Sequence, residues 1–278
     1  MPYQIVGTPE DVVNRWGRTS FEHLARLHHS ADAGPSGVQL VTKFGLYSSE
    51  VPERPSWQDI VYRFQDITAA QLASMGSLKA FQGGFACETF VADPTVYLPW
   101  LHGRIDALGG VKRVTGKVAS LTELPEGYAA IFNCTGASLF IVDCAHSLTP
   151  RAHMNARAGL GSLQLLGDDA LLPIRGQVLR VRAPWIKHSW TFDGTHYVIP
   201  NVNSVVVGGT QQRGNFSEAV DAVDSASIFE TCARYIPSLR GAEVLYEWVR
   251  AVAALPVDPA RCDKRRQQLA VWHGRLSG

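Results

Sequence analysis

The sequence predicts a mixed α/β (α+β) fold, in which an α/β layer is intertwined with an antiparallel sheet. A predicted helix over residues 95–108 is followed by apolar strands near residues 111–118 and 129–132, the alternation expected of an α/β layer. The second half of the chain instead carries short β-branched segments separated by turn residues, which favour antiparallel pairing. These two patterns define the fold class.

The first elements of the chain alternate between helix and strand. Residues 21–28 have apolar side chains at helical spacing, and the preceding Thr19 and Ser20 are candidates for the N-cap. Residues 38–43 read as a strand between two glycines. Thr68 is predicted to begin a short helix, because Gln71 stands at the capping-box position three residues later.

The helix over residues 95–108 has the clearest periodicity in the chain. Gly109 and Gly110 are expected to end it, and Pro99 is expected in its first turn, where the missing N–H costs nothing. The apolar face that defines it consists of Tyr97, Leu98, Leu101, Ile105 and Leu108.

The second half of the chain is predicted to be mainly sheet. The expected strands lie at residues 177–181, 197–199 and 204–207, and a helix is expected at residues 225–235. Two segments do not fit any simple pattern. They are residues 137–159, which interrupt an otherwise tight sequence, and residues 250–278, which are rich in alanine and arginine.

Composition excludes several classes of protein. The 278 residues carry 26 Lys and Arg against 25 Asp and Glu, so the net charge of +1 gives no basic surplus for nucleic acid. No apolar run reaches the roughly 20 residues of a membrane helix, and no secretory signal is apparent. Five cysteines without a C-x-x-C pair predict neither a disulfide framework nor a zinc knuckle, and a reducing compartment fits best.

Common catalytic signatures are missing from the sequence. There is no G-x-G-x-x-G, no P-loop, no H-E-x-x-H and no G-x-S-x-G. His188 and His196 have no third ligand at metal spacing, so no metal site is predicted. Cys134 follows an apolar strand and is better explained as a small buried residue than as a nucleophile.

Longer segments, taken in order, resemble the D-amino acid oxidase family of flavoenzymes, and within it the members that oxidise D-aspartate. The resemblance runs from roughly Trp16 to Val249 and omits residues 137–159. It rests on NCTG (133–136), PIRGQVLRVRAPW (173–185) and YVIPNVNSVVVGGTQQRGNF (197–216), with support from AGPSGVQLV (33–41), YLPWLHGRI (97–105) and GLGSLQLLGDDALLPIRGQ (159–177).

The resemblance implies an FAD cofactor, a D-amino acid substrate of D-aspartate type or broader, and oxygen as the electron acceptor. The products would be a 2-oxo acid, ammonia and hydrogen peroxide. Tyr197 matches the tyrosine that binds the substrate carboxylate, although a packed strand tyrosine with a solvated hydroxyl explains it equally well from the residues alone. Val118, Thr135 and Gly136 match positions that contact FAD. No nucleic acid or membrane partner is expected, and the oligomeric state is left open.

Several positions depart from the family pattern. The glycine-rich strand–turn–helix that holds the FAD pyrophosphate has no counterpart, so residues 1–249 read as a truncated FAD-binding layer joined to the substrate sheet, with an insertion at 137–159. Gln211 stands where D-aspartate-oxidising members have an arginine, and Arg213 lies two residues further on. Family members often carry a C-terminal peroxisomal tripeptide, which is absent here, so a peroxisomal or a cytoplasmic location is expected. A catalytically inactive fragment without stable FAD binding is the alternative.

Overall fold

One large sheet dominates the structure. The computed structural model describes residues 9–109, 128–133, 147–155 and 172–254. The strands of this sheet are β1 (Val38–Tyr47), β2 (Tyr62–Thr68), β3 (Gly83–Ala92), β6 (Leu172–Arg182), β7 (Ser189–Phe192), β8 (His196–Pro200), β9 (Val205–Gly208), β10 (Gln212–Arg213) and β11 (Glu243–Ala254). Within the described residues they follow the order β10-β6-β9-β8-β7-β1-β3-β2, and β11 pairs with β6.

The antiparallel pairing expected of the second half is confirmed, but the sheet extends beyond that half. Strands β6, β8 and β9 contain the predicted segments and pair antiparallel with one another or with neighbours. The sequence assigned no partner to the strand at residues 38–43, which became β1. In the structure β1 pairs parallel with β7 and antiparallel with β3, so the N-terminal strands join the same sheet. Because β1 and β7 are far apart in the sequence, no local pattern of residues predicts that they pair.

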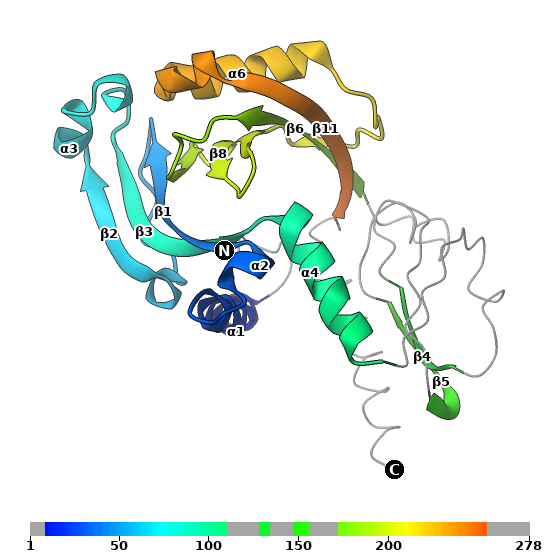
Figure 1. Ribbon diagram of the computed structural model, residues 1–278. Coiled ribbons are helices and arrows are strands. Elements are labelled where there is room, and N and C mark those ends of the chain that lie inside the picture. Colours follow the sequence, from blue (N-terminus) through cyan, green and yellow to red (C-terminus); the bar gives the residue numbers. More distant parts are fainter. Residues whose placement is uncertain (1–8, 110–127, 134–146, 156–171, 255–278) are drawn as a thin grey trace.

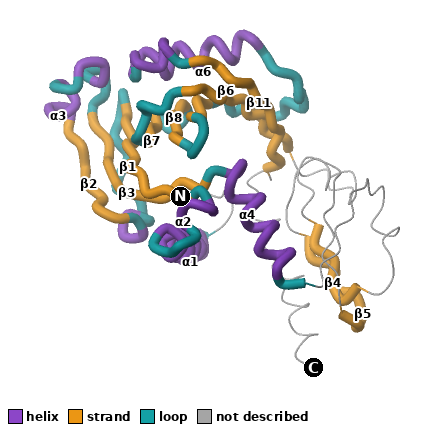
Figure 2. The backbone as a smooth tube through the Cα atoms, viewed as in Figure 1, coloured by secondary structure: helices purple, strands orange, loops and turns teal. Residues whose placement is uncertain are grey.

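Helices cover one side of this sheet, which we call the outer face (Figures 1 and 2). Helix α6 lies along β6, β8 and β9, while α1 lies against β1 and β3. The opposite side is called the inner face. The helices are α1 (Glu10–His28), α2 (Ala33–Ser36), α3 (Ala69–Ala73), α4 (Pro94–Ala107) and α6 (Ala222–Tyr235), with 3-10 turns η1 (Gln58–Ile60), η2 (Gly76–Leu78) and η4 (Pro237–Gly241).

The main hydrophobic core lies between the outer face and α6. Alternate residues of β6, β7, β8 and β9 point into it, because successive side chains of a strand face opposite sides. Helix α6 contributes three buried residues, and two rings from outside the helix stack there at 5.6 Å between centroids. The most deeply buried members are Leu46, Leu72, Phe81, Val181, Phe192, Val198, Val207, Ile228, Cys232 and Leu239.

The first helix is longer than its sequence pattern predicted. It runs from Glu10 rather than from residue 21, and Thr19 is not a cap, since its hydroxyl donates to the Arg15 carbonyl at 3.1 Å inside the helix. Glu10 and Asp11 occupy the first turn, where acidic side chains stabilise a helix N-terminus. The polar Thr19–Ser20 pair was therefore a misleading signal within a continuous helix.

The predicted position of Pro99 in the helix near residue 95 was wrong. Helix α4 begins at Pro94, and the side chain of Asp93 accepts from the Thr95 backbone N–H at 3.1 Å. Pro99 therefore lies inside the helix, where it removes one intrahelical hydrogen bond, and not in the first turn as predicted. By contrast, the Thr68–Gln71 capping box at the start of α3 is confirmed.

The α/β layer is described only in part. Strand β4 (Tyr128–Asn133) confirms the strand expected at residues 129–132, and it pairs parallel with β5 (Ser147–Asn155), which lies inside the 137–159 segment. The strand expected at 111–118 lies outside the described residues. Strand β11 continues past Val249 to Ala254, so the C-terminal segment begins as sheet. No helix in the described ranges is long and apolar enough to cross a membrane.

Candidate functional site

Tyr197 lies in the middle of the inner face of the sheet. It pairs with Thr191 of β7 on one side and with Gly208 of β9 on the other, and Gly45 of β1 pairs in turn with Thr191. Paired residues of neighbouring strands point to the same side of a sheet. These residues therefore form one row across four strands, which we call the tyrosine row.

Polar side chains gather on this face although they are shielded from solvent. Lys43, Thr89, Ser189 and Thr191 belong to the inner face by alternation and register, and each is at most 8% exposed. The outer face of the same strands contributes the core residues Leu46, Ala86 and Phe192. Burying polar groups costs free energy unless they are hydrogen-bonded, and no buried polar side-chain atom among the described residues lacks a partner. A buried polar face of this kind is typical of a ligand site rather than of a core.

Glycines determine where the tyrosine ring lies. A Cβ built on Gly208 would stand 2.4 Å from Cζ of Tyr197 and 2.7 Å from its hydroxyl oxygen, and one on Gly209 would stand 3.0 Å from that oxygen. The ring therefore lies directly over the Gly208–Gly209 backbone. Only a residue without a side chain permits this approach. The hydroxyl is thereby held over the β9 end of the inner face.

A buried arginine fastens the chain that follows this turn. Arg175 of β6 is 1% exposed, and its guanidinium donates to Asp224 at 2.6 Å, to Gln212 at 3.1 Å and to two backbone carbonyls at 3.1 and 2.8 Å. Gln177 adds a bond from its backbone N–H to the hydroxyl of Thr210 at 2.9 Å. The network ties residues 210–224 to the outer side of β6. The network therefore gives a structural role to Arg175 and Gln177 of the R-G-Q segment and to Thr210 of the G-G-T segment.

Asp93 joins the start of α4 to the sheet. Besides capping α4, its buried carboxylate accepts from the Val202 backbone N–H at 3.2 Å, and one of its oxygens lies 4.0 Å from the guanidinium of Arg180. Arg180 pairs with Val206 and therefore belongs to the inner face. One carboxylate thus holds together a helix N-terminus, the β8–β9 turn and the sheet.

The remaining site residues predicted from sequence are scattered or outside the described residues. Gln211 and Arg213 are exposed, whereas Gln212 between them turns toward Arg175. Arg213 pairs with Ile174 on β6, five residues beyond Gly208, so it lies toward the margin of the inner face and away from Tyr197. The three residues proposed to contact the cofactor, Val118, Thr135 and Gly136, lie outside the described residues.

The two described cysteines do not offer a nucleophile. Burial raises the pKa of Cys87 to about 11 and that of Cys232 to about 12. The thiol of Cys232 reaches the carbonyls of Gly208 and Tyr197 from the outer side, at 3.6 and 3.8 Å. Because a thiol with so high a pKa stays protonated near neutral pH, these cysteines are structural.

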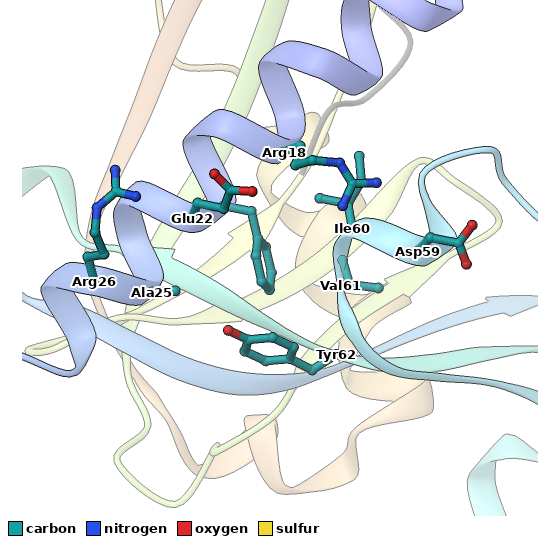
Figure 3. Close-up of a pocket in the computed structure, with 9 residues that line it drawn as sticks. Arg18, Glu22, Ala25, Arg26, Asp59, Ile60, Val61 and Tyr62 are labelled. Atoms are coloured by element: carbon teal, nitrogen blue, oxygen red, sulfur yellow. The ribbon is translucent and has the colours of Figure 1, made fainter.

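A cavity lies between α1 and the start of β2 (Figure 3). It has a volume of about 400 Å³, with Arg18, Glu22 and Arg26 spaced along α1 and Tyr62 facing the helix. Asp59 of the 3-10 turn η1 also lines it. The two arginines and two carboxylates balance in charge, so the rim favours neither an anion nor a cation. The inner face remains the candidate functional site.

Several solved structures share the fold of this chain. Glycine oxidase from Geobacillus kaustophilus superposes with a TM-score of 0.59 at 16% identity, covering 91% of this chain and 70% of that protein. L-proline dehydrogenase from P. horikoshii gives a TM-score of 0.57 at 12% identity, covering 91% and 70%. At these identities the likeness shows the fold alone.

The chain matches the FAD dependent oxidoreductase (DAO) family over residues 4–267 and belongs to that family. Human D-aspartate oxidase is 34% identical over 245 residues, which is 87% of this chain and 64% of the human protein. D-aspartate oxidase 1 of Caenorhabditis elegans is 30% identical, covering 86% and 66%. D-amino-acid oxidase of Rubrobacter xylanophilus is 29% identical, covering 85% and 64%. The chain thus spans slightly less than two thirds of the length of these relatives.

FAD is the cofactor of this family, but the described residues do not supply a site for its pyrophosphate. Such sites use free backbone N–H groups at a helix N-terminus. In α4 and α6 those groups already bond to Asp93 and Asp221, in α3 they bond to Thr68, and the first turn of α1 is acidic. The N-termini of α1, α3, α4 and α6 therefore do not offer a site for a diphosphate in this conformation.

Proposed function

We propose that the chain functions as an FAD-dependent oxidase of D-amino acids, with acidic D-amino acids as the preferred substrates. The overall reaction would convert a D-amino acid, oxygen and water to a 2-oxo acid, ammonia and hydrogen peroxide. FAD would supply the electron acceptor. The proposal is supported chiefly by one observation: a tyrosine that matches the family's carboxylate-binding position lies on a buried, polar sheet face.

In this proposal Tyr197 donates a hydrogen bond from its phenol to the substrate α-carboxylate. The Gly208–Gly209 backbone under the ring fixes where the hydroxyl lies, which reduces the entropy lost when a ligand binds. Ser189 and Thr191, buried beside it, contribute further hydroxyl groups to the same face. Hydrogen bonds to a carboxylate are stronger than neutral ones, and exclusion of water strengthens them further.

The second candidate function is that of a catalytically inactive family member that does not bind FAD stably. It is favoured by a specific observation, since the N-termini of α3, α4 and α6 are capped by side chains of this chain. This candidate keeps the carboxylate-binding face but predicts no oxidation.

The two candidates are separated by flavin retention and turnover. The purified chain is incubated with excess FAD, freed of unbound flavin and examined by absorbance, and hydrogen peroxide is then measured with D-aspartate, D-glutamate, D-alanine and L-aspartate. A retained flavin band with peroxide from the D-amino acids alone supports the oxidase. A folded chain that retains no flavin and forms no peroxide contradicts it and favours the inactive member. Tyr197→Phe is the matched variant, because it removes only the hydroxyl.

A further inference from the structure

A lysine that sequence analysis treated only as the end of a strand lies on the inner face. Lys43 is in the middle of β1, it alternates with Gly45 of the tyrosine row, and it pairs with Ser189 of β7 and Cys87 of β3. It is 5% exposed. Lysine is almost never so deeply buried unless its charge has a partner or a function.

The ammonium of Lys43 lies near the ring of Phe85. Its Nζ lies 5.9 Å from the centroid of the Phe85 ring. Phe85 pairs with Gly45, and its ring covers that glycine, since a Cβ built there would stand 2.4 Å from the ring. The ammonium therefore lies near a ring that belongs to the same row of paired residues as Tyr197.

Lys43 and Tyr197 lie on the same face of the sheet, two strands apart. Strand β7 separates β1 from β8, so the two residues are about 9–10 Å apart across the strands and about 7 Å apart along them. Their Cα atoms are thus separated by roughly 12 Å, and both side chains extend several ångströms from the backbone. The positions between them are Ser189 and Thr191, whose short hydroxyl side chains take little of that space.

Two groups of β3 near Lys43 do not form an ion pair with it. Cys87, directly across from it, stays a neutral thiol, because burial raises its pKa to about 11 despite the opposing effect of the nearby ammonium. Glu88 belongs to the outer face and bonds to Arg63 at 2.9 Å. A lysine ammonium also has three N–H donors, so it can bond within the protein and to a ligand oxygen at once.

We propose that Lys43 recognises the side-chain carboxylate of an acidic D-amino acid whose α-carboxylate is bound at Tyr197. This inference rests on the proposed function and names the residue that selects its substrate class. Arg213 is the competing cation from sequence, but it is exposed and lies toward the margin of the sheet. A buried ammonium discriminates more strongly than an exposed guanidinium, because solvent screens the latter.

The test is the affinity of the full chain for D-aspartate and for D-alanine, measured by calorimetry with excess FAD in every sample. The wild-type chain is expected to prefer D-aspartate by roughly ten- to a hundredfold, which is the range for one charge-assisted hydrogen bond. Lys43→Met should weaken the binding of D-aspartate until this preference is lost, whereas Lys43→Arg should retain part of it. Lys79→Met, which alters an exposed lysine, is the control.

Two results would overturn the inference while leaving the proposed function intact. One is a Lys43→Met chain that is folded by circular dichroism and keeps the full preference for D-aspartate. The other is loss of that preference in Arg213→Met but not in Lys43→Met, which would assign selection to the sheet margin. A wild-type chain that binds neither amino acid would overturn both this inference and the carboxylate site on which it rests.

Discussion

Replacing Gly208 with alanine should displace the tyrosine ring that defines the site. The added Cβ would stand 2.4 Å from Cζ of Tyr197. Non-bonded carbon atoms prefer a separation of about 3.5–4.0 Å, so the ring has to move by roughly 1 Å. The backbone under the ring belongs to paired strands β8 and β9 and resists movement. The side chain of Tyr197, rather than the backbone, is therefore expected to move.

The cost of this movement can be bounded. Tyr197 is half-buried, so its ring can turn toward the space above the sheet. A torsion displaced by about 30° from its rotamer costs about 0.5–1.5 kcal/mol, and overpacking typically costs about 1–3 kcal/mol. We expect Gly208→Ala to lower the free energy of unfolding by about 1–2 kcal/mol. A hydroxyl displaced by about 1 Å should weaken D-alanine binding at least tenfold.

The assay is urea unfolding combined with calorimetric titration of D-alanine. Gly241→Ala is the control, because a Cβ there meets nothing within 4 Å, and its stability should stay within about 0.5 kcal/mol of wild type. In a Tyr197→Ala background the cost of Gly208→Ala should largely disappear, since the two residues contact each other. An equal cost in both backgrounds, or unchanged D-alanine binding in Gly208→Ala, would refute the argument.

Three further predictions concern the supports of the site. Arg175→Met should destabilise the chain by about 3–5 kcal/mol in urea unfolding, because it leaves buried acceptors unpaired, whereas the exposed Arg182→Met should cost less than about 1 kcal/mol. Asp93→Ala should cost about 2–4 kcal/mol through the lost cap of α4 and the lost partner of Val202, and Asp93→Asn should cost less. Burial lowers the pKa of His196 from 6.5, so the unfolded chain binds the proton more readily, and stability should fall as the pH drops below about 6.5. His196→Gln should flatten that dependence in thermal melts between pH 7.5 and 5.5, and an unchanged slope would contradict it.

Local features of the structure follow closely from the sequence. The Thr68–Gln71 capping box forms as predicted, because its two hydrogen bonds lie within four residues. Helix α6 is confirmed, and its start at Ala222 reflects the Asp221 cap, which bonds to two backbone N–H groups. Asp193 and Gly194 both have positive φ, which suits the turn residues that separate the short strands.

Parts of the candidate site could be inferred from sequence, and one part could not. Tyr197 was indicated by a family resemblance, and its place on β8 followed from strand alternation. Lys43 was missed, although a signal existed: a lysine at an alternate position within an apolar strand, between Val41 and Gly45. That pattern shows which face the lysine occupies but not what else lies on that face.

The sequence by itself determined the family, the short antiparallel strands of the second half and the type of most helices. These depend on residue order, spacing and local hydrogen bonds. Only the tertiary structure decided that β1 pairs parallel with β7, which brings Lys43 and Tyr197 onto one face across 154 residues of chain. Register between distant strands is set by the packing of the whole sheet, and no local propensity encodes it.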